Sequence, residues 1–446
     1  MKHLAILGTV LLLLTLGGQA LHQPGALGVG TPERKLEFVA LLAVAAATYM
    51  YAVAWVVRRT FPARALWLVF GIGLGLRLGV LFGPPILSTD IYRYVWDGRV
   101  QAAGNNPYVY VPSDPALTAL RDDMVYPRIN RIDSARTIYA PAAEIVFGVI
   151  GTIAPGVLAI KAVMVGFEAL AVLCLLRLLA MARLPATRVL IYLWNPLAVW
   201  AFAGNGHVDA MAIGLLAAAM LLRARGRDGS AGAMFAACVL VKFLPLIVAP
   251  ALWRGRSRIA LVAAASAATL YAWYLGAGRH ILGFLPKYPA DEKLDTGNGF
   301  WLLAGLDHLS ALPPVAAKLY MAVCALGLAA LGLWVWRTRR PPLGTPADVL
   351  LIAGQAAALM AAVRVAISPH YPWYFCWLAL PCVLRPSPAL LWLSVSPVLL
   401  YLNPFDEQFV WPALVYGPAL LLFAWDLTRT RLAKAAGAPP AIEGGR

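Results

Sequence analysis

The stretch 88–108, STDIYRYVWDGRVQAAGNNPY, gathers charged and aromatic side chains directly after a long apolar segment. The residues that share one face of a helix with 3.6 residues per turn are Asp90, Arg93, Tyr94 and Asp97. A carboxyl group at the edge of an apolar segment is energetically costly unless it has a partner or a chemical task. A carboxylate in such a place can take a proton from a reacting hydroxyl group, so this face indicates acid–base chemistry.

A helix is expected in this stretch because Ser88 or Thr89 can cap its first turn and Gly104 can end it. The other side of the helix, which carries Tyr92 and Trp96, is typical of the aromatic belt at a membrane surface. A solvated interfacial helix would explain these two aromatic residues. It would leave the acidic face without a role.

The composition of the chain excludes an ordinary soluble protein. Of its 446 residues, 61% are hydrophobic and 13% are charged, and the mean hydropathy is +0.73. Apolar runs of about 20 residues recur, and they lack the two-residue alternation of membrane β-strands. We therefore predict an all-α polytopic membrane protein with about 12–14 transmembrane helices, because backbone groups in lipid must bond within their own segment.

Short polar stretches separate the predicted apolar segments. We place these segments at 4–20, 36–57, 65–83, 159–181, 187–203, 207–223, 230–253, 256–275, 313–336, 346–366, 370–384, 387–402 and 411–428. Arginine clusters between them account for the net charge of +16 as topology signals, so no nucleic-acid partner is expected. The segment 230–253 is basic at both ends, and Lys242 and Pro245 predict a break that makes it a hairpin.

The alternation of basic and acidic loops predicts that both termini are cytoplasmic. The polar motifs then collect on the extracytoplasmic face of the cytoplasmic membrane, and loops as long as the first outer loop are usually functional. The predicted parts are two N-terminal transmembrane helices in 1–64, a core in 65–428 with outer loops 84–158 and 276–312, and a disordered cytoplasmic tail in 429–446.

The first apolar segment allows two interpretations. Lys2 precedes an apolar run that ends near Ala20, and this arrangement is also typical of a cleaved signal peptide. We interpret the segment as an uncleaved membrane helix.

Several motifs in the chain resemble those of one enzyme family. They are STDIYRYVWDGRVQAAGNNPY, YPRIN and TIYAP in the first outer loop, followed by GNGHVDAMA, VKFLPL and SPHYPWY. The set is similar to the bacterial mannosyltransferase-type members of the GT-C glycosyltransferase superfamily over roughly residues 65 to 400. Two additional N-terminal helices precede the part that carries the resemblance.

The resemblance implies a GT-C type bundle with amphipathic helices in its first outer loop. It implies an inverting glycosyltransferase that moves one hexose, expected to be mannose, from a polyprenyl-phosphate sugar to a glycan, glycolipid or protein acceptor. The family's catalytic acid stands at the position of Asp90, which is therefore the expected general base. Relatives often have a second acid where this chain has Thr89, and a Tyr-Pro-Pro pattern followed by Gln where it has YAPAAE.

The leaving group in such a reaction is a lipid phosphate, which calls for cationic and hydrogen-bonding partners. The residues expected to bind the donor phosphate are Lys242, His370, Tyr371, Arg364 and Arg93. The residues expected to bind the rest of the substrates are Tyr94, Asp97, Tyr139, His207, Asp209, Asn298 and Trp301.

These assignments have structural alternatives. Lys242 could extend from a helix end to the membrane surface. His207 and Asp209 could cap the following helix. Asp97 could hold Arg93 instead of touching a sugar.

A transporter or flippase of lipid-linked sugars is the rival function. Arg77, Lys242 and Arg364 lie within apolar segments, and such charges also mark transport pathways. Arg77 could instead balance an acid such as Asp90 or Glu168. The long, one-sided, motif-rich loop favours an enzyme, because a transporter predicts repeat symmetry and no convincing repeat is visible in the sequence.

The sequence contains no pattern that indicates a metal ion or a cofactor. Asp122 and Asp123 are adjacent, so they point to different faces, and the five cysteines lack metal-ligand spacing. We therefore expect no metal, no cofactor and no disulfide, with membrane lipid as the surrounding partner.

Overall fold

The computed structural model describes residues 1–22, 31–403, 406 and 409–435. All regular secondary structure in these residues is helical, which confirms the predicted all-α fold. Six helices are long and apolar enough to cross a membrane, and up to eight if each sharply bent pair counts as one span. The chain is therefore a multi-pass membrane protein.

The first third of the chain forms three long helices and an outer part. Its elements are α1 (Lys2–Ala20), α2 (Pro32–Arg58), α3 (Ala65–Leu81), α4 (Asp90–Ala102), η1 (Pro115–Leu120), η2 (Tyr126–Arg128) and α5 (Pro141–Ile153). The helix α1 packs on both α2 and α3. Glycine permits their close approach, since a Cβ at Gly8 would lie 2.7 Å from Ile72.

The middle of the chain forms the buried centre of the bundle. Its elements are α6 (Val157–Met181), η3 (Ala186–Val189), α7 (Leu190–Leu193), α8 (Pro196–Val199), the π-helix η4 (Trp200–Gly204), α9 (Asp209–Ala224), α10 (Asp228–Val239), η5 (Leu244–Val248) and α11 (Ala249–Trp253). The predicted break in 230–253 is confirmed, because the chain leaves α10 before Lys242 and re-enters a helix after it.

The last part of the chain alternates long helices with short ones. Its elements are α12 (Ser257–Ala272), η6 (Leu275–His280), η7 (Leu285–Lys287), α13 (Tyr288–Asp291), α14 (Trp301–Leu309), α15 (Ala316–Arg337), α16 (Pro346–Ile367), η8 (Pro372–Leu378), α17 (Ala379–Leu384), α18 (Pro388–Leu393), η9 (Ser396–Tyr401) and α19 (Val410–Ala435). The helix α19 continues into the stretch predicted as a disordered tail, so that prediction is wrong for residues 429–435. The rest of the tail, 436–446, lies outside the described residues.

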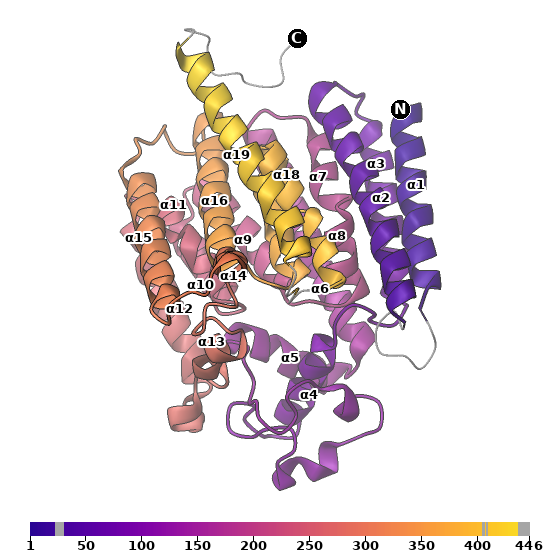
Figure 1. The fold of residues 1–446 in the computed structure, drawn as a ribbon, viewed down its shortest axis with the longest axis vertical. Coiled ribbons are helices and arrows are strands. Elements are labelled where there is room, and N and C mark those ends of the chain that lie inside the picture. Colours follow the sequence, from indigo (N-terminus) through magenta and orange to yellow (C-terminus); the bar gives the residue numbers. More distant parts are fainter. Residues whose placement is uncertain (23–30, 404–405, 407–408, 436–446) are drawn as a thin grey trace.

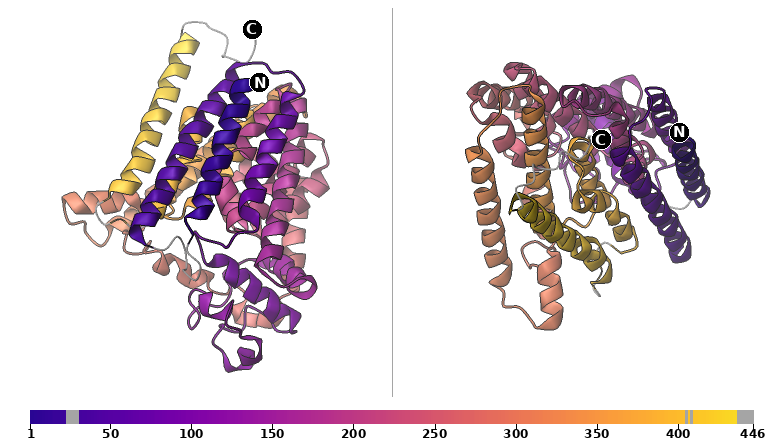
Figure 2. Two further views of the ribbon diagram at one scale, coloured as in Figure 1. Left: turned by 90° about the vertical axis from the view of Figure 1, so that its right-hand side faces the viewer. Right: turned by 90° about the horizontal axis from the view of Figure 1, so that it is seen from above.

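The outer helices lie at one end of the bundle. Figure 1 shows α4, α5 and α13 at the end opposite to the start of α1 and the last turns of α19. A view turned by 90° shows α4 and α5 at the same end, beyond the long helices (Figure 2). Among the described residues, the start of α1 and the last turns of α19 therefore lie at one end and the first long loop at the other.

The helices α4 and α5 cross at very short range, and this contact fixes α4. A Cβ at Gly98 would lie 2.4 Å from the Phe147 carbonyl oxygen, and a Cβ at Gly151 would lie 2.2 Å from that of Gly98. Only glycine permits such an approach of two backbones.

Trp96, on the aromatic side of α4, is covered by protein, so its predicted place in an aromatic belt is wrong. The Trp96 side chain is 1% exposed, and its ring centroid lies 5.4 Å from that of Tyr126. The segment that follows α4 folds back over the helix, and burial of the aromatic ring there replaces contact with lipid.

Candidate active site

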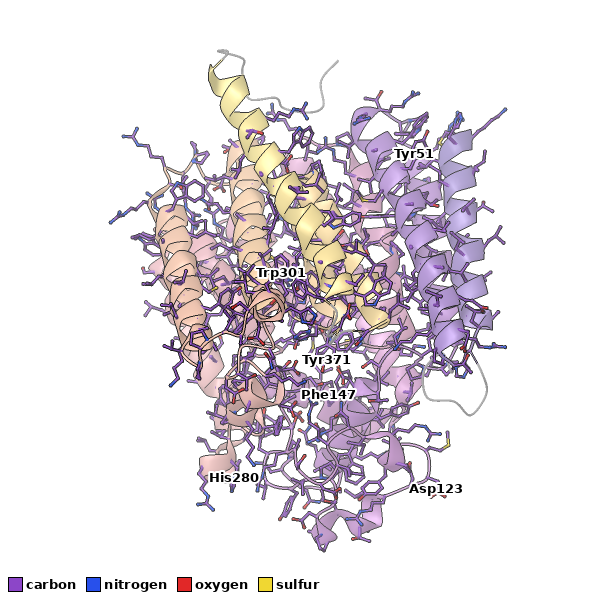
Figure 3. All side chains as sticks on the ribbon, in the orientation of Figure 1. Tyr51, Asp123, Phe147, His280, Trp301 and Tyr371 are labelled. Atoms are coloured by element: carbon purple, nitrogen blue, oxygen red, sulfur yellow. The ribbon has the colours of Figure 1, made fainter. Side chains whose placement is uncertain are left out.

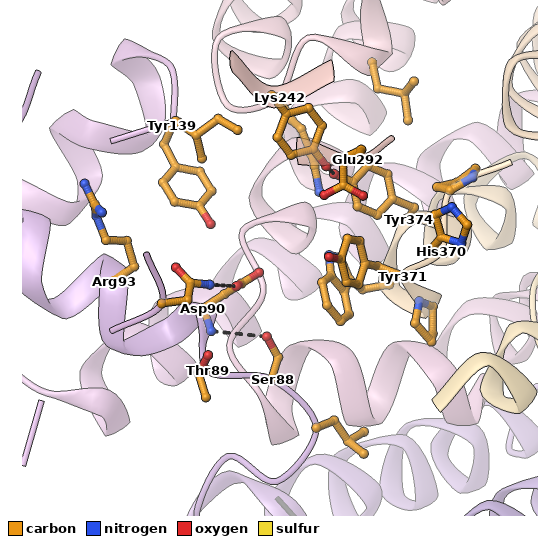
Figure 4. A pocket seen from close by; sticks show the side chains of 18 of the residues that line it. Ser88, Thr89, Asp90, Arg93, Tyr139, Lys242, Glu292, His370, Tyr371 and Tyr374 are labelled. Carbon is orange, nitrogen blue, oxygen red and sulfur yellow. Dashed lines mark hydrogen bonds between the residues drawn. The ribbon is translucent and has the colours of Figure 1, made fainter. Parts of the chain in front are cut away.

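A cavity of about 760 Å³ lies where α4 meets the bundle. Both outer loops contribute to its walls, together with the turn after α10 and the segment after α16. Figure 4 shows Asp90 on one side of this cavity, and Lys242, His370 and Tyr371 across from it. Lys35 and Phe38 of α2 also line it, so the second N-terminal helix takes part in forming the site.

Asp90 is the first residue of α4, and its carboxyl group faces the cavity. Its backbone N–H donates to Ser88 Oγ at 3.2 Å, and Asn130 Nδ2 donates to Asp90 Oδ1 at 3.0 Å. Gly104, with φ of +80°, follows the end of the helix as predicted. Burial raises the pKa of Asp90, although the positive charge of Lys242 and the Asn130 hydrogen bond oppose this rise.

His207 lies behind Asp90. Its Nδ1 is 3.8 Å from Asp90 Oδ2, and its ring stacks on Trp373 at 4.0 Å between centroids. Among the described residues, neither ring nitrogen of His207 has a hydrogen-bond partner. The helix α9 begins at Asp209 without a side-chain cap, so the capping alternative for His207 and Asp209 is wrong.

Lys242 occupies the turn between α10 and η5, where a break in the helix brings its ammonium group to the cavity. Its Nζ lies 3.0 Å from both carboxylate oxygens of Asp209 and 3.7 Å from the ring centroid of Tyr374. Trp377 Nε1 donates to Asp209 Oδ1 at 2.7 Å. Asp209 therefore holds Lys242 from behind and is not itself part of the cavity wall.

Arg364 projects from the last turn of α16 and also lines the cavity. Its Nε donates to the Tyr374 carbonyl at 2.6 Å, and its Nη1 donates to the Met360 carbonyl at 2.9 Å. Its buried Nη2 has no hydrogen-bond acceptor among the described residues. Arg364 therefore retains a donor that a bound anion could satisfy.

His370 and Tyr371 follow α16 and complete this wall. His370 Nε2 lies 3.0 Å from the Gly299 carbonyl oxygen, which ties the segment to the second outer loop. The Tyr371 ring stacks on Trp373 at 4.9 Å. Both side chains line the cavity.

Comparison with protein families and with individual proteins gives one match. The model of the alpha-(1->6)-mannopyranosyltransferase N-terminal domain (MptA_B family) matches residues 4–254, more than half of the chain. The chain belongs to this mannosyltransferase family. Searches of curated proteins and of solved structures found no match.

Membership of the mannosyltransferase family supports transfer of a mannosyl group as the activity of the chain. The match extends over α1 and α2, so these two helices lie within the family's domain. It ends after α11, which leaves Arg364, His370 and Tyr371 outside the matched part.

The two outer loops of this mannosyltransferase meet at an ion pair that the sequence did not predict. Arg131 pairs with Asp291, and its Nη2 lies 3.9 Å from Glu292 Oε1. Burial raises the pKa of Glu292, which lines the cavity, to about 6. Arg131 directly follows the YPRIN motif, and this position was the one available signal for it.

The guanidinium group of Arg93 pairs with Asp97, another residue of α4. Its Nε lies 2.9 Å and 3.0 Å from the two oxygens of Asp97, and its Nη1 donates to the Ala135 carbonyl at 2.9 Å. This pair is the predicted alternative in which Asp97 holds Arg93. Nearby, Glu144 accepts from Thr137 Oγ1 at 2.6 Å and joins α5 to the same buried polar group.

Two aromatic residues line the cavity near Asp90. Tyr94 and Tyr139 pack edge to face, with their ring centroids 4.9 Å apart, and the Tyr139 hydroxyl points into the cavity (Figure 4). Asn298 and Trp301, in contrast, are not among the lining residues. Trp301 stacks on Tyr416 at 5.1 Å and lies higher in the bundle than Tyr371 (Figure 3).

Arg77 does not contribute to the cavity. Its Nη2 lies 2.6 Å from Glu168 Oε1, and both side chains are buried within the bundle. Glu168 is therefore the acid that balances Arg77. This pairing removes one of the three charges that favoured a transport pathway.

Proposed function

We propose that this mannosyltransferase transfers one mannosyl group from a polyprenyl-phosphate mannose to an acceptor hydroxyl on the extracytoplasmic side of the membrane. The observation that carries the proposal is that Asp90 lies across the cavity from Lys242 (Figure 4), with Arg364 lining the same cavity. A carboxylate on one side suits proton removal, and fixed cations on the other suit a phosphate leaving group.

The reaction balances with these groups alone. The acceptor oxygen attacks the anomeric carbon from the face opposite to the phosphate, so the configuration inverts. The bond between the anomeric carbon and the phosphate oxygen breaks, and polyprenyl phosphate leaves with the bonding electron pair. The acceptor proton passes to Asp90, whose raised pKa makes it a better proton acceptor than an ordinary aspartate.

Phosphate binding is assigned to the wall that faces Asp90. Lys242, Arg364, His370 and Tyr371 supply positive charge and hydrogen-bond donors there. Arg93 has a different role, because its guanidinium group is engaged by Asp97 and holds α4 in place.

The sugar and the lipid tail occupy the remaining walls. Tyr94 and Tyr139 offer aromatic faces and a hydroxyl to the mannosyl group. Apolar residues at the bundle side, including Ile367 and Leu400, line the path by which a prenyl chain enters from the bilayer. Asp209 and His207 act from behind Lys242 and Asp90, whereas Asn298 and Trp301 remain candidates for the acceptor side.

The donor is tested with the purified protein in lipid vesicles and a membrane extract as acceptor source. We expect radiolabelled mannose to reach acceptors from polyprenyl-phosphate mannose and not from a nucleotide-linked mannose. Transfer from the nucleotide-linked sugar would contradict the proposal. Movement of the lipid-linked sugar across vesicles without any transfer would support a flippase instead.

A further inference from the structure

The end of the bundle opposite to α4 and α5 contains a second group of charged residues, of which Arg223 and Asp348 are buried and the others are half-buried. We call it the arginine cluster, and its members are Arg223, Arg254, Arg256 and Arg340 with Asp228 and Asp348. These residues come from the end of α9, the start of α10, the loops after α11 and α15, and the start of α16. The cluster is separate from the Asp90 cavity, since none of its members lines that cavity.

Two of the four arginines already have carboxylate partners. Arg223 Nη1 lies 2.5 Å from Asp348 Oδ2, and Arg256 pairs with Asp228. Among the described residues, Arg254 and Arg340 form no ion pair with a carboxylate. The cluster therefore carries an excess of positive charge.

The excess charge is accompanied by hydrogen-bond donors that lack acceptors. Arg254 Nη1 and both Nε and Nη1 of Arg340 are buried and have no acceptor among the described residues. Burial, together with the nearby positive charge of Arg223 and Arg254, lowers the pKa of Arg340 to about 10. Buried donors of this kind are rare in folded proteins, and a bound anion would satisfy them.

An apolar groove lies beside these two arginines, although neither of them lines it. It has a volume of about 660 Å³ and runs between η5–α11 and α15, which stands at the edge of the bundle beside α11 (Figure 1). Trp253 and Trp336 line the groove, and Arg254 follows Trp253 directly in the sequence. Arg340 Nη2 donates at 3.1 Å to the carbonyl of Pro250, another residue of the groove.

We propose that the groove binds an anionic phospholipid, with an acyl chain between α11 and α15 and the phosphate at Arg254 and Arg340. The apolar walls exclude a purely polar ligand, and the unpaired guanidinium groups select a negative charge at one end. Basic pockets between transmembrane helices bind anionic headgroups in this way. The indole Nε1 of Trp253, which is buried without an acceptor among the described residues, adds a donor for the headgroup.

The first test compares three ligands on the full-length protein in a neutral detergent. Phosphatidylglycerol, phosphatidylcholine and inorganic phosphate are titrated separately, and the thermal unfolding midpoint and native mass spectra are recorded. We expect phosphatidylglycerol to bind and raise the midpoint at concentrations at which the other two do neither. Equal effects of the two lipids, or a full effect of phosphate alone, would overturn the proposal.

Variants locate the site. Arg254→Gln combined with Arg340→Gln removes the positive charge, and Ala329→Phe places a ring in the groove wall. Each change should reduce phosphatidylglycerol binding at least tenfold, whereas Arg339→Gln, an exposed neighbour, should not. Wild-type binding by the folded Ala329→Phe variant, or by the double variant, would contradict the assignment. The result does not depend on the identity of the sugar donor.

Discussion

Charged residues are buried both in the centre of the bundle and around the Asp90 cavity, but they are paired differently. In the bundle, Arg77 and Glu168 form a closed pair with side chains 4% and 3% exposed. At the cavity, Asp90 is held mainly by Asn130, and Arg364 keeps a buried donor without an acceptor among the described residues. The carboxylate and the cations at the cavity face each other across space that a substrate can fill.

This difference separates charges that hold the fold from charges that are available to a ligand. Both kinds incur a desolvation cost, and only a partner offsets it. The Arg77–Glu168 pair is closed within the fold, whereas at the cavity Arg364 keeps a donor that a bound substrate can satisfy. Lys242 is paired with Asp209 but also lines the cavity. Sequence position alone does not distinguish them, because Arg77 and Arg364 both lie in apolar segments.

The largest effect is expected from removing the carboxylate at the cavity. Asp90→Asn keeps the size and the Asn130 contact but cannot accept the acceptor proton, so kcat should fall by about 10²–10⁴-fold. Initial rates of mannosyl transfer measure the effect, with Asp123→Asn, an exposed acid of the same loop, as control. If both variants keep wild-type rates, Asp90 is not the base, and the cavity carboxylate has no catalytic role that distinguishes it from an exposed acid.

The next effect concerns the closed pair in the bundle and should appear in stability instead of activity. Glu168→Gln leaves the Arg77 guanidinium buried without a countercharge, which should cost about 3–5 kcal/mol of unfolding free energy. Denaturant unfolding in one detergent measures the loss. The transfer rate per folded molecule should not change, and a large fall in that rate with unaltered stability would place this pair in the catalytic machinery.

A smaller effect is expected at the cationic wall. Lys242→Met removes a charge that stabilises the departing phosphate, so kcat should fall by about 10²-fold. Asp209→Asn should have a weaker effect of the same kind, because Asp209 acts through Lys242. Lys287→Gln, at an exposed position of the second outer loop, is the control. If Asp209→Asn reduced transfer and Lys242→Met did not, Asp209 would not act through Lys242.

The smallest effect is a shift along the pH axis. The base must be ionised, and burial raises the pKa of Asp90; activity should therefore be lost, as pH falls, at a higher pH than for an exposed aspartate. Below that pKa, kcat/KM should fall about tenfold per pH unit. Glu292, with a pKa of about 6, titrates in the same cavity. The acid limb should persist in Glu292→Gln, and its disappearance would assign the limb to Glu292.

The all-α membrane fold could be predicted from the sequence because hydropathy determines which segments are buried in the membrane. Most predicted apolar segments correspond to single helices, but 187–203, 230–253, 370–384 and 387–402 are each divided into two or more short helical elements. What hydropathy does not encode is where a helix bends. The chain turns by 114° between Pro196–Gly204 and Asp209–Ala224, and this bend brings His207 behind Asp90.

The candidate site was only partly predictable, for a related reason. Asp90, Lys242 and Arg364 are unusual in apolar surroundings, and each was identified from that property and from the family resemblance. Arg131 and Glu292 occur in polar loops, where charged residues are ordinary, and only the approach of the two loops brings them together. Trp96 was wrongly placed at the membrane surface because the spacing of aromatic residues along a helix does not show whether a loop covers them.

The most direct test separates binding from chemistry in one preparation of Asp90→Asn. Polyprenyl-phosphate mannose binding and single-turnover mannosyl transfer would be measured side by side with the wild type in identical vesicles. We predict donor binding within a few-fold of wild type and a transfer rate reduced by about 10²–10⁴-fold. Wild-type transfer by the folded variant would show that Asp90 is not the base, and the account of the cavity would have to be abandoned.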